Sequence, residues 1–134
     1  MKKRSLGRTG LELSELGLGA MTFGGEGAAW KAIGALPQSA ANELVAQALD
    51  AGVNWFDTAD MYGAGASESM LAKALGARRN DVVVATKVGF PQGSGPKQGR
   101  LTRLHIHSAA EASLKRLGGD ALDLYFLQIG RAHV

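Results

Sequence analysis

Four short apolar runs along the chain have the composition of buried β-strands. They cover residues 16–21, 53–57, 82–87 and 122–127. β-Branched and aromatic residues are concentrated in the last three, and such residues favour packed, pleated surfaces. Upstream of the first run, Leu11-Glu12-Leu13 alternates apolar with polar residues behind a glycine-containing turn. This arrangement predicts a short β-hairpin over residues 2–18 that leads into the first strand.

Between these runs, apolar residues recur at helical spacing in three segments. The stripes consist of Leu44, Val45, Ala48 and Leu49; of Met70, Leu71, Ala74 and Leu75; and of Ile106, Ala110, Leu114 and Leu117. The predicted N-caps are Ser39, Ser67 and Thr102, because their side chains can accept from free backbone N–H groups. A capping box at Ser108 and Glu111 leaves open a later start for the third helix. Residues 24–37, rich in Gly and Ala, are predicted to be a loop.

The elements therefore alternate as β, α, β, α, β, α, β after the hairpin. Alternation of this kind with buried strands indicates a parallel sheet with right-handed crossovers. A flavodoxin-like sheet and half of a (β/α)8 barrel both fit this order. Residues 89–99 form a connection that is longer than the geometry needs, which predicts a lid or a binding loop.

Composition narrows the class of protein. The 134 residues suffice for one domain, and the absence of cysteine excludes disulfides and thiolate metal sites. No apolar run approaches the roughly 18 residues of a membrane span. The basic start, Met1-Lys2-Lys3-Arg4, is not followed by the apolar stretch of a signal peptide, so we expect a cytoplasmic protein. The net charge is +3, but the basic residues are scattered, which argues against a nucleic-acid partner.

Ionisable side chains close two of the predicted strands. Asp57 ends the second run, Lys87 ends the third, and Tyr62 follows in a glycine-containing loop. Charges at the carboxyl ends of strands are typical of the catalytic rim of an α/β barrel. The alternatives are a turn aspartate, a solvated lysine and a packing tyrosine. We interpret His105 and His107 as surface or packing residues, and Trp30, Trp55 and Phe90 as candidates for an apolar pocket, with barrel packing the stronger reading for Trp55.

Several stretches together resemble the aldo-keto reductase family. They include Gly7-Arg8-Thr9-Gly10, Leu16-Gly17-Leu18-Gly19, Phe56-Asp57-Thr58-Ala59, Tyr62-Gly63, Ser67-Glu68, Ala85-Thr86-Lys87, 111–118 and Leu122-Asp123-Leu124-Tyr125. They occur in order along nearly the whole chain. The resemblance implies an α/β fold that is the N-terminal half of a (β/α)8 TIM barrel, with about four strands preceded by the hairpin. A complete barrel of this kind has about 250 residues.

The resemblance also implies a chemistry. The family reduces aldehydes and ketones with a hydride from NADPH and without a metal. Tyr62 matches the family's proton donor, Lys87 the lysine whose charge favours the phenolate, and Asp57 the carboxylate that pairs with the lysine. The cofactor is expected to contact Gly19, Ala20, Met21 and Asp57. The expected partner is a small carbonyl substrate, while the oligomeric state stays open.

The chain departs from the family near its end. The family's fourth active-site residue is a histidine, and Gln128 stands at its position; His133 is not in register with it. Residues 129–134 match nothing in the family, and DNA that resembles a common sequencing adapter can encode them; the alternative is a genuine short protein with an unusual terminus. We therefore interpret residues 1–128 as a partial barrel domain and 129–134 as an artefactual tail. Such a fragment is expected to be inactive alone. The alternatives are a non-catalytic regulatory or interaction subunit of the same fold and a homodimer that completes the barrel.

Overall fold

The computed structural model describes residues 1–91 and 101–128. A parallel sheet of four strands lies at its centre, in the order β3-β4-β5-β6. The strands are β3 (Leu18–Gly19), β4 (Trp55–Asp57), β5 (Val83–Val88) and β6 (Leu124–Leu127). Strand order follows chain order, so each crossover adds the next strand on the same side. The four predicted strands are confirmed; β3, β4 and β6 are shorter than predicted, and β5 begins and ends one residue later.

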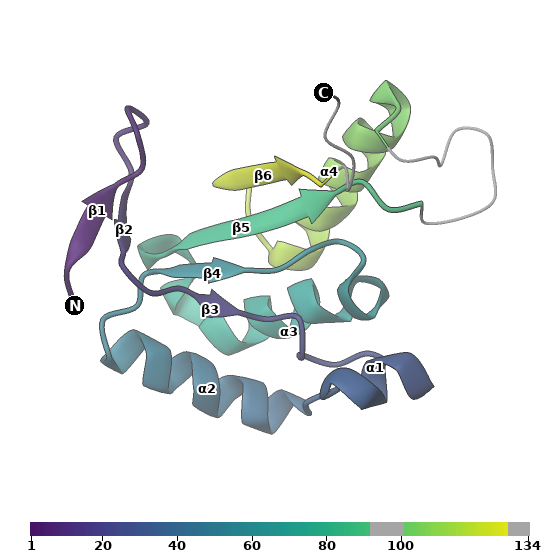
Figure 1. Ribbon diagram of the computed structural model, residues 1–134, viewed down its shortest axis with the longest axis horizontal. Helices are drawn as coiled ribbons and strands as arrows, with labels where there is room; N and C mark the ends of the chain where they lie inside the picture. The colour runs from purple at the N-terminus through teal and green to yellow at the C-terminus, as the bar shows by residue number, and fades with distance from the viewer. Residues whose placement is uncertain (92–100, 129–134) are drawn as a thin grey trace.

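The N-terminal hairpin is separate from this sheet. It pairs β1 (Lys3–Ser5) with β2 (Glu12–Ser14) in antiparallel register. Figure 1 shows it at the end of the sheet where the parallel strands begin. Asn54, just before β4, holds it there, because the Asn54 side chain accepts from the Ser14 N–H at 2.7 Å and donates to the Glu12 carbonyl at 2.8 Å. The predicted hairpin is confirmed, and it closes the amino end of the sheet.

Three long helices lie on one side of the sheet in Figure 1, and they connect its strands. They are α2 (Gln38–Asp50), α3 (Ala66–Leu75) and α4 (Arg103–Leu117). The apolar stripes of α2 and α3 pack against the alternate residues of β4 and β5 that face them, above all Phe56 and Val84, which are 0% and 1% exposed. The stripe predicted for α4 is wrong except at Leu117, because the buried residues of this helix are His105, Ala109, Ser113 and Leu117. The remaining core residues of this layer are Ala20, Phe23, Ala41, Val45, Leu71, Leu75, Val82 and Leu117.

Two of the three predicted N-caps are wrong. Helix α2 begins one residue before Ser39, behind Pro37, and α3 begins at Ala66 behind Gly65, whose φ of 90° only glycine adopts easily. The Ser67 side chain is instead turned into the protein, where other partners take its hydroxyl. Thr102 is confirmed as the cap of α4, since its Oγ1 accepts from the His105 N–H at 3.3 Å. A later start at Ser108 is therefore wrong.

A short helix was not expected from the sequence. Helix α1 (Ala28–Ile33) lies within the predicted loop 24–37. It has no buried residue and therefore no apolar stripe, and glycines bound it on both sides. Short 3-10 segments also occur at η1 (Tyr62–Gly65) and η2 (Gly76–Asp81). The predicted lid at 89–99 falls almost wholly outside the described residues.

Candidate active site

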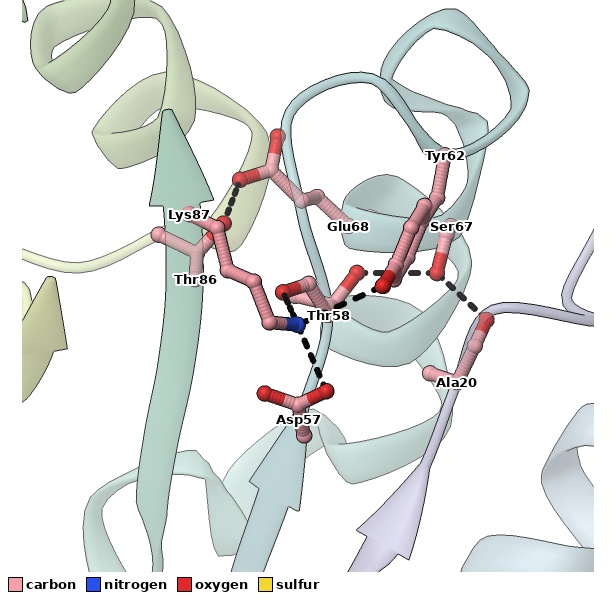
Figure 2. Close-up of polar contacts among 8 residues, drawn as sticks. All are labelled: Ala20, Asp57, Thr58, Tyr62, Ser67, Glu68, Thr86 and Lys87. Carbon is pink, nitrogen blue, oxygen red and sulfur yellow. Dashed lines mark hydrogen bonds and ion pairs between the residues drawn. The ribbon is translucent and has the colours of Figure 1, made fainter. Parts of the chain in front are cut away.

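Asp57, Tyr62 and Lys87 meet at the carboxyl end of the sheet (Figure 2). The Lys87 ammonium donates to Asp57 Oδ2 at 2.6 Å and to the Thr58 carbonyl at 2.9 Å. A longer contact of 3.4 Å joins Lys87 Nζ to the Tyr62 hydroxyl. The clustering predicted from the strand ends is confirmed by these distances.

Strand register explains why the lysine and the carboxylate face each other. Asp57 pairs with Ala85 across β4 and β5, so Lys87 stands two residues farther along the neighbouring strand. Side chains two apart on a strand point to the same face. Asp57, Ala85 and Lys87 therefore share the face of the sheet opposite the helices, which in a closed barrel is the interior.

The tyrosine reaches the site through a tight turn. Directly after Tyr62, Gly63 and Ala64 have φ values of 57° and 54°, a left-handed conformation that glycine adopts without strain. A Cβ at Gly63 would also lie 2.9 Å from the Cα of Gly25. Glycine at 63 is thus required for two reasons, and the turn it makes holds the phenol over the end of β4.

The hydrogen-bond inventory of Lys87 fixes the direction of each contact. An ammonium has three donors and no acceptor, and Lys87 has three oxygen partners: Asp57, Thr58 and Tyr62. The Tyr62 oxygen must therefore accept from Lys87, which leaves its own hydrogen available to another acceptor. The ammonium also lies 5.0 Å from the centre of the Tyr62 ring.

The ion pair is only partly screened by solvent. The side chains of Lys87 and Asp57 are 15% and 29% exposed. Attraction between charges is stronger in such a setting than in bulk water. The pair is thus held firmly enough to fix the ammonium, and both side chains keep some exposure to solvent.

The residues expected to contact the cofactor lie at the same edge. Gly19 is the last residue of β3 and pairs with Asp57, and a Cβ at Gly19 would meet nothing within 4 Å. The Met21 side chain is 43% exposed. Ala20 is fully buried, and both its backbone groups are engaged, the N–H by the Asp57 carbonyl and the carbonyl by the Ser67 hydroxyl. The open space at Gly19 and Met21 fits a flat ring resting against them, whereas Ala20 would contribute shape alone.

Some of the remaining predicted residues lie at the carboxyl end of the sheet, and others have packing roles. Gln128 follows β6 directly, is exposed, and its N–H donates to the Val88 carbonyl at 2.8 Å. Trp55 packs at the opposite end of the sheet: its indole N–H donates to the Ser14 carbonyl at 3.0 Å, and its ring lies against Gly17. Barrel packing is the better interpretation of Trp55. Trp30 lies on α1 with its ring against Gly25, and Phe90 is 44% exposed.

A cluster of buried polar groups lies beside the trio and was not expected from the sequence. Asp60, Glu68 and His105 are 1%, 0% and 4% exposed. Within the described residues, neither Asp60 Oδ2 nor His105 Nε2 has a hydrogen-bond partner. The packing role expected of His105 is thus confirmed, while His107 is exposed. An apolar pattern cannot reveal such a cluster, because its members are polar residues between the stripes.

Burial and neighbouring charges raise the pKa values of Asp60, in this cluster, and of Tyr125. Burial, and next the charge of Glu68, raise the pKa of Asp60 above its ordinary value of 3.8, although His105 and Arg116 oppose the shift. Burial, together with the charges of Asp60 and Glu68, raises the pKa of Tyr125 to about 12. The Tyr125 hydroxyl donates to the Ile106 carbonyl at 3.3 Å. Tyr125 is therefore a structural hydrogen-bond donor, distinct from Tyr62.

Replacement of Asp60 by asparagine tests this cluster. Folding raises the pKa of this carboxyl. Such a group contributes its full stabilisation at pH values below its pKa in the unfolded chain, and that contribution is lost as pH rises through its pKa in the folded chain. Asp60→Asn cannot ionise, so its stability relative to the original chain should improve between about pH 4 and pH 7. Urea unfolding at both pH values measures the difference. An equal difference at the two pH values would contradict the raised pKa.

Neither a cluster of metal ligands nor a helix able to span a membrane occurs in the part of the chain that the structure describes. Residues 1–91 and 101–128 contain no group of three or more histidine or acidic side chains placed to hold a metal ion. Within the same ranges, every helix is too short or too polar to cross a bilayer.

Comparison with known proteins shows which family the chain belongs to. A sequence model of the Aldo/keto reductase family matches residues 15–130. The chain belongs to the aldo/keto reductase family. The solved "aldo-keto reductase AKR11C1 from Bacillus halodurans (holo form)" is similar at 38% identity with a TM-score of 0.74, covering 93% of this chain and 39% of that one. The expected fold, the N-terminal part of a (β/α)8 barrel, is thereby confirmed, and the flavodoxin-like alternative is wrong.

Two curated relatives show how much of an aldo/keto reductase the chain represents. A "Probable voltage-gated potassium channel subunit beta" of Oryza sativa subsp. japonica is 41% identical over 130 residues, 94% of this chain and 37% of its own length. The "Uncharacterized oxidoreductase YqkF" of Bacillus subtilis is 36% identical over 132 residues, 97% and 40% respectively. The chain thus spans about two fifths of the relatives it matches. The proposed boundary at residue 128 stays a prediction, since 129–134 lie outside the described residues.

Proposed function

We propose that the protein to which this chain belongs reduces aldehydes or ketones to alcohols, and catalyses the reverse reaction, with NADPH. The observation that carries the proposal is the contact of one ammonium with both a carboxylate and a phenol, the Lys87 contacts at 2.6 Å and 3.4 Å. The substrate would be a small carbonyl compound. A cytoplasmic location and the lack of a nucleic-acid partner belong to the same proposal.

The bound nicotinamide supplies the hydride, and this chain's residues handle the charge and the proton. As the carbonyl carbon is reduced, its oxygen gains negative charge and requires a proton. Tyr62 donates that proton, because its oxygen accepts from Lys87 and its own hydrogen is free. Lys87 stabilises the phenolate that remains. Asp57 keeps the ammonium in place and, with Gly19, Ala20 and Met21, forms the surface against which the cofactor would rest.

The position of Gln128 bears on the same reaction. It stands where the family has a histidine, at the end of the fourth parallel strand. A glutamine amide can donate a hydrogen bond to a carbonyl oxygen, but it cannot take the charged form that histidine can. We expect that a histidine at position 128 would serve the reaction better than the glutamine of this chain.

A grafted barrel tests the proposal directly. Residues 1–127 of this chain would replace the matching part of the B. halodurans aldo-keto reductase, so that position 128 and the later strands come from that protein. The graft should oxidise NADPH at 340 nm only when a reactive aromatic aldehyde is present. The 134-residue chain alone should not, because most of the barrel is missing. A folded graft that binds NADPH but never oxidises it would contradict the proposal.

A second candidate is a non-catalytic subunit of the same fold. One observation favours it, the 41% identity with the rice protein named as a potassium channel β subunit. Retention of Asp57, Tyr62 and Lys87 in contact argues for the reductase, since a subunit without a reaction has no need of this geometry. The two candidates give opposite outcomes in the grafted barrel.

A further inference from the structure

Two adjacent polar residues in the first turn of α3 are completely buried. Ser67 and Glu68 are both 0% exposed. Figure 2 shows that they reach in different directions, Ser67 toward the ends of β3 and β4 and Glu68 toward β5. Neither residue caps the helix. The reaction described above assigns nothing to either of them.

The Ser67 hydroxyl joins two strand ends. Its Oγ lies 2.6 Å from the Ala20 carbonyl and 2.8 Å from Thr58 Oγ1. A carbonyl can only accept, so the single Ser67 proton goes to Ala20. The Thr58 hydroxyl must therefore be the donor to Ser67. Thr58 thus has a fixed side chain, and its carbonyl is the oxygen that accepts from the Lys87 ammonium at 2.9 Å.

Glu68 holds the residue before Lys87. Its Oε1 accepts from the Thr86 hydroxyl at 2.6 Å, and its Oε2 accepts from Arg116 Nε at 2.5 Å. Thr86 is itself 0% exposed. It points to the helix side of β5 while Lys87 points to the other side. The carboxylate therefore anchors the strand at the peptide from which the lysine side chain emerges.

We propose that Ser67 and Glu68 are positioning residues that hold the Lys87 ammonium against Tyr62 from two sides. Ser67 acts through Thr58, which provides one of the three oxygen partners of the ammonium. Glu68 acts through Thr86, which fixes the strand beneath it. The functional meaning rests on the proposed reductase chemistry, because a phenol donor depends on the exact place of the neighbouring charge. Small displacements of catalytic groups lower rates steeply.

Energetics argue that this arrangement serves more than packing. Burying a hydroxyl or a carboxylate costs free energy that only well-made hydrogen bonds offset. Apolar side chains at these two positions would fill the same volume without that cost. All four hydrogen bonds made by Ser67 and Glu68 lead to strand ends or to the neutralising Arg116. Such a network fixes geometry, which is its use next to a reacting group.

Proton exchange of the Lys87 ammonium provides a test that needs no activity. In the ¹⁵N-labelled chain, a clamped ammonium exchanges slowly enough to give an NMR signal, and Lys87→Met identifies it by loss of that signal. Thr58→Val and Thr86→Val each remove one hydroxyl at nearly constant volume. Each should accelerate the exchange by about fivefold, the factor expected for one ordinary hydrogen bond. Thr58→Ser and Thr86→Ser should restore slow exchange.

A control and the contradicting results complete the design. Ser69→Ala removes a hydroxyl of the same helix whose one hydrogen-bond partner among the described residues is the Gly65 carbonyl, at 3.3 Å, and should leave the Lys87 signal unchanged. Exchange within about a factor of two of the original in both valine variants would overturn the proposal. So would the absence of any slowly exchanging Lys87 signal in the original chain.

The same variants in the grafted barrel separate this inference from the proposed function. There, the valine variants should lower kcat about tenfold and the serine variants should recover it. A graft without reductase activity in any form would contradict the reaction, while the exchange data would still decide whether Ser67 and Glu68 position the lysine. An active graft whose kcat is the same with and without the valine substitutions would overturn the positioning role alone.

Discussion

Replacing Tyr62 with phenylalanine in the grafted barrel should lower kcat for a reactive aromatic aldehyde by at least about a hundredfold, the lower end of general acid–base contributions. The change removes one oxygen, the atom that lies 3.4 Å from Lys87 Nζ and that would meet the substrate carbonyl, while the ring that faces the ammonium is kept. Gly19 and Met21, which are proposed to contact the cofactor, are untouched. The dissociation constant for NADPH, followed by fluorescence titration, should therefore stay nearly the same.

Tyr125 offers a matched control for this experiment. It is the other tyrosine of the chain, and Tyr125→Phe removes a hydroxyl that donates to the Ile106 carbonyl, away from Lys87. Activity of the Tyr125→Phe graft should stay within about threefold of the original, because loss of a neutral hydrogen bond acts here only through stability. A Tyr62→Phe enzyme that kept more than about a tenth of its kcat would show that another group donates the proton.

Replacement of Arg116 should lower the free energy of unfolding more than replacement of any exposed charged residue. Glu68 is 0% exposed, and Arg116 is the charged partner of its carboxylate. Arg116→Met keeps the length of the side chain but leaves a buried carboxylate with the Thr86 hydroxyl alone. Breaking a buried pair in this way costs about 3–5 kcal/mol of unfolding free energy. Urea unfolding at neutral pH measures it.

Two comparisons make that measurement decisive. Arg78→Met breaks an exposed ion pair with Asp81, whose side chains are 59% and 58% exposed, and should cost less than about 1 kcal/mol. The double variant Arg116→Met with Glu68→Gln removes the unpaired charge and should regain most of the loss. If the double variant were no more stable than Arg116→Met alone, lost packing around residue 116, and not the stranded carboxylate, would explain the effect.

The sequence revealed the layers of the fold because burial leaves a periodic signal. Strands and long helices carry apolar residues at periods that the core enforces, so β4, β5 and the existence of all three long helices were predictable. The buried face of α4 was not, because two of its four buried residues are the polar His105 and Ser113. Helix α1 was not, because it buries nothing and its alanines and glycines fit a loop equally well. The starts of α2 and α3 were misplaced because serine at a helix start usually caps, whereas Ser67 lies one residue inside and bonds elsewhere.

The site was predictable to a similar extent. Asp57 ends β4 and Lys87 is the last residue but one of β5, and the carboxyl ends of parallel strands lie at one edge of the sheet. Their placement at one edge therefore followed from the element order, while their place on neighbouring strands followed from the barrel fold. The buried group of Asp60, Glu68 and His105 did not follow. Its members lie in a loop and on two helices, and their meeting depends on how α3 and α4 pack together. Pattern reasoning places residues on elements, but it does not give the contacts between elements.

The two tryptophans of the chain stand at opposite ends of the sheet and can serve as separate optical probes. Trp55 is tied to the hairpin through the Ser14 carbonyl, so its emission should report opening of the amino end. Trp30 lies on α1, which Figure 1 places beyond the end of β3, at the carboxyl end of the sheet. A single-tryptophan chain carrying Trp55→Phe would thus follow events at the catalytic edge by fluorescence, and one carrying Trp30→Phe would follow the hairpin, with no dye attached to either.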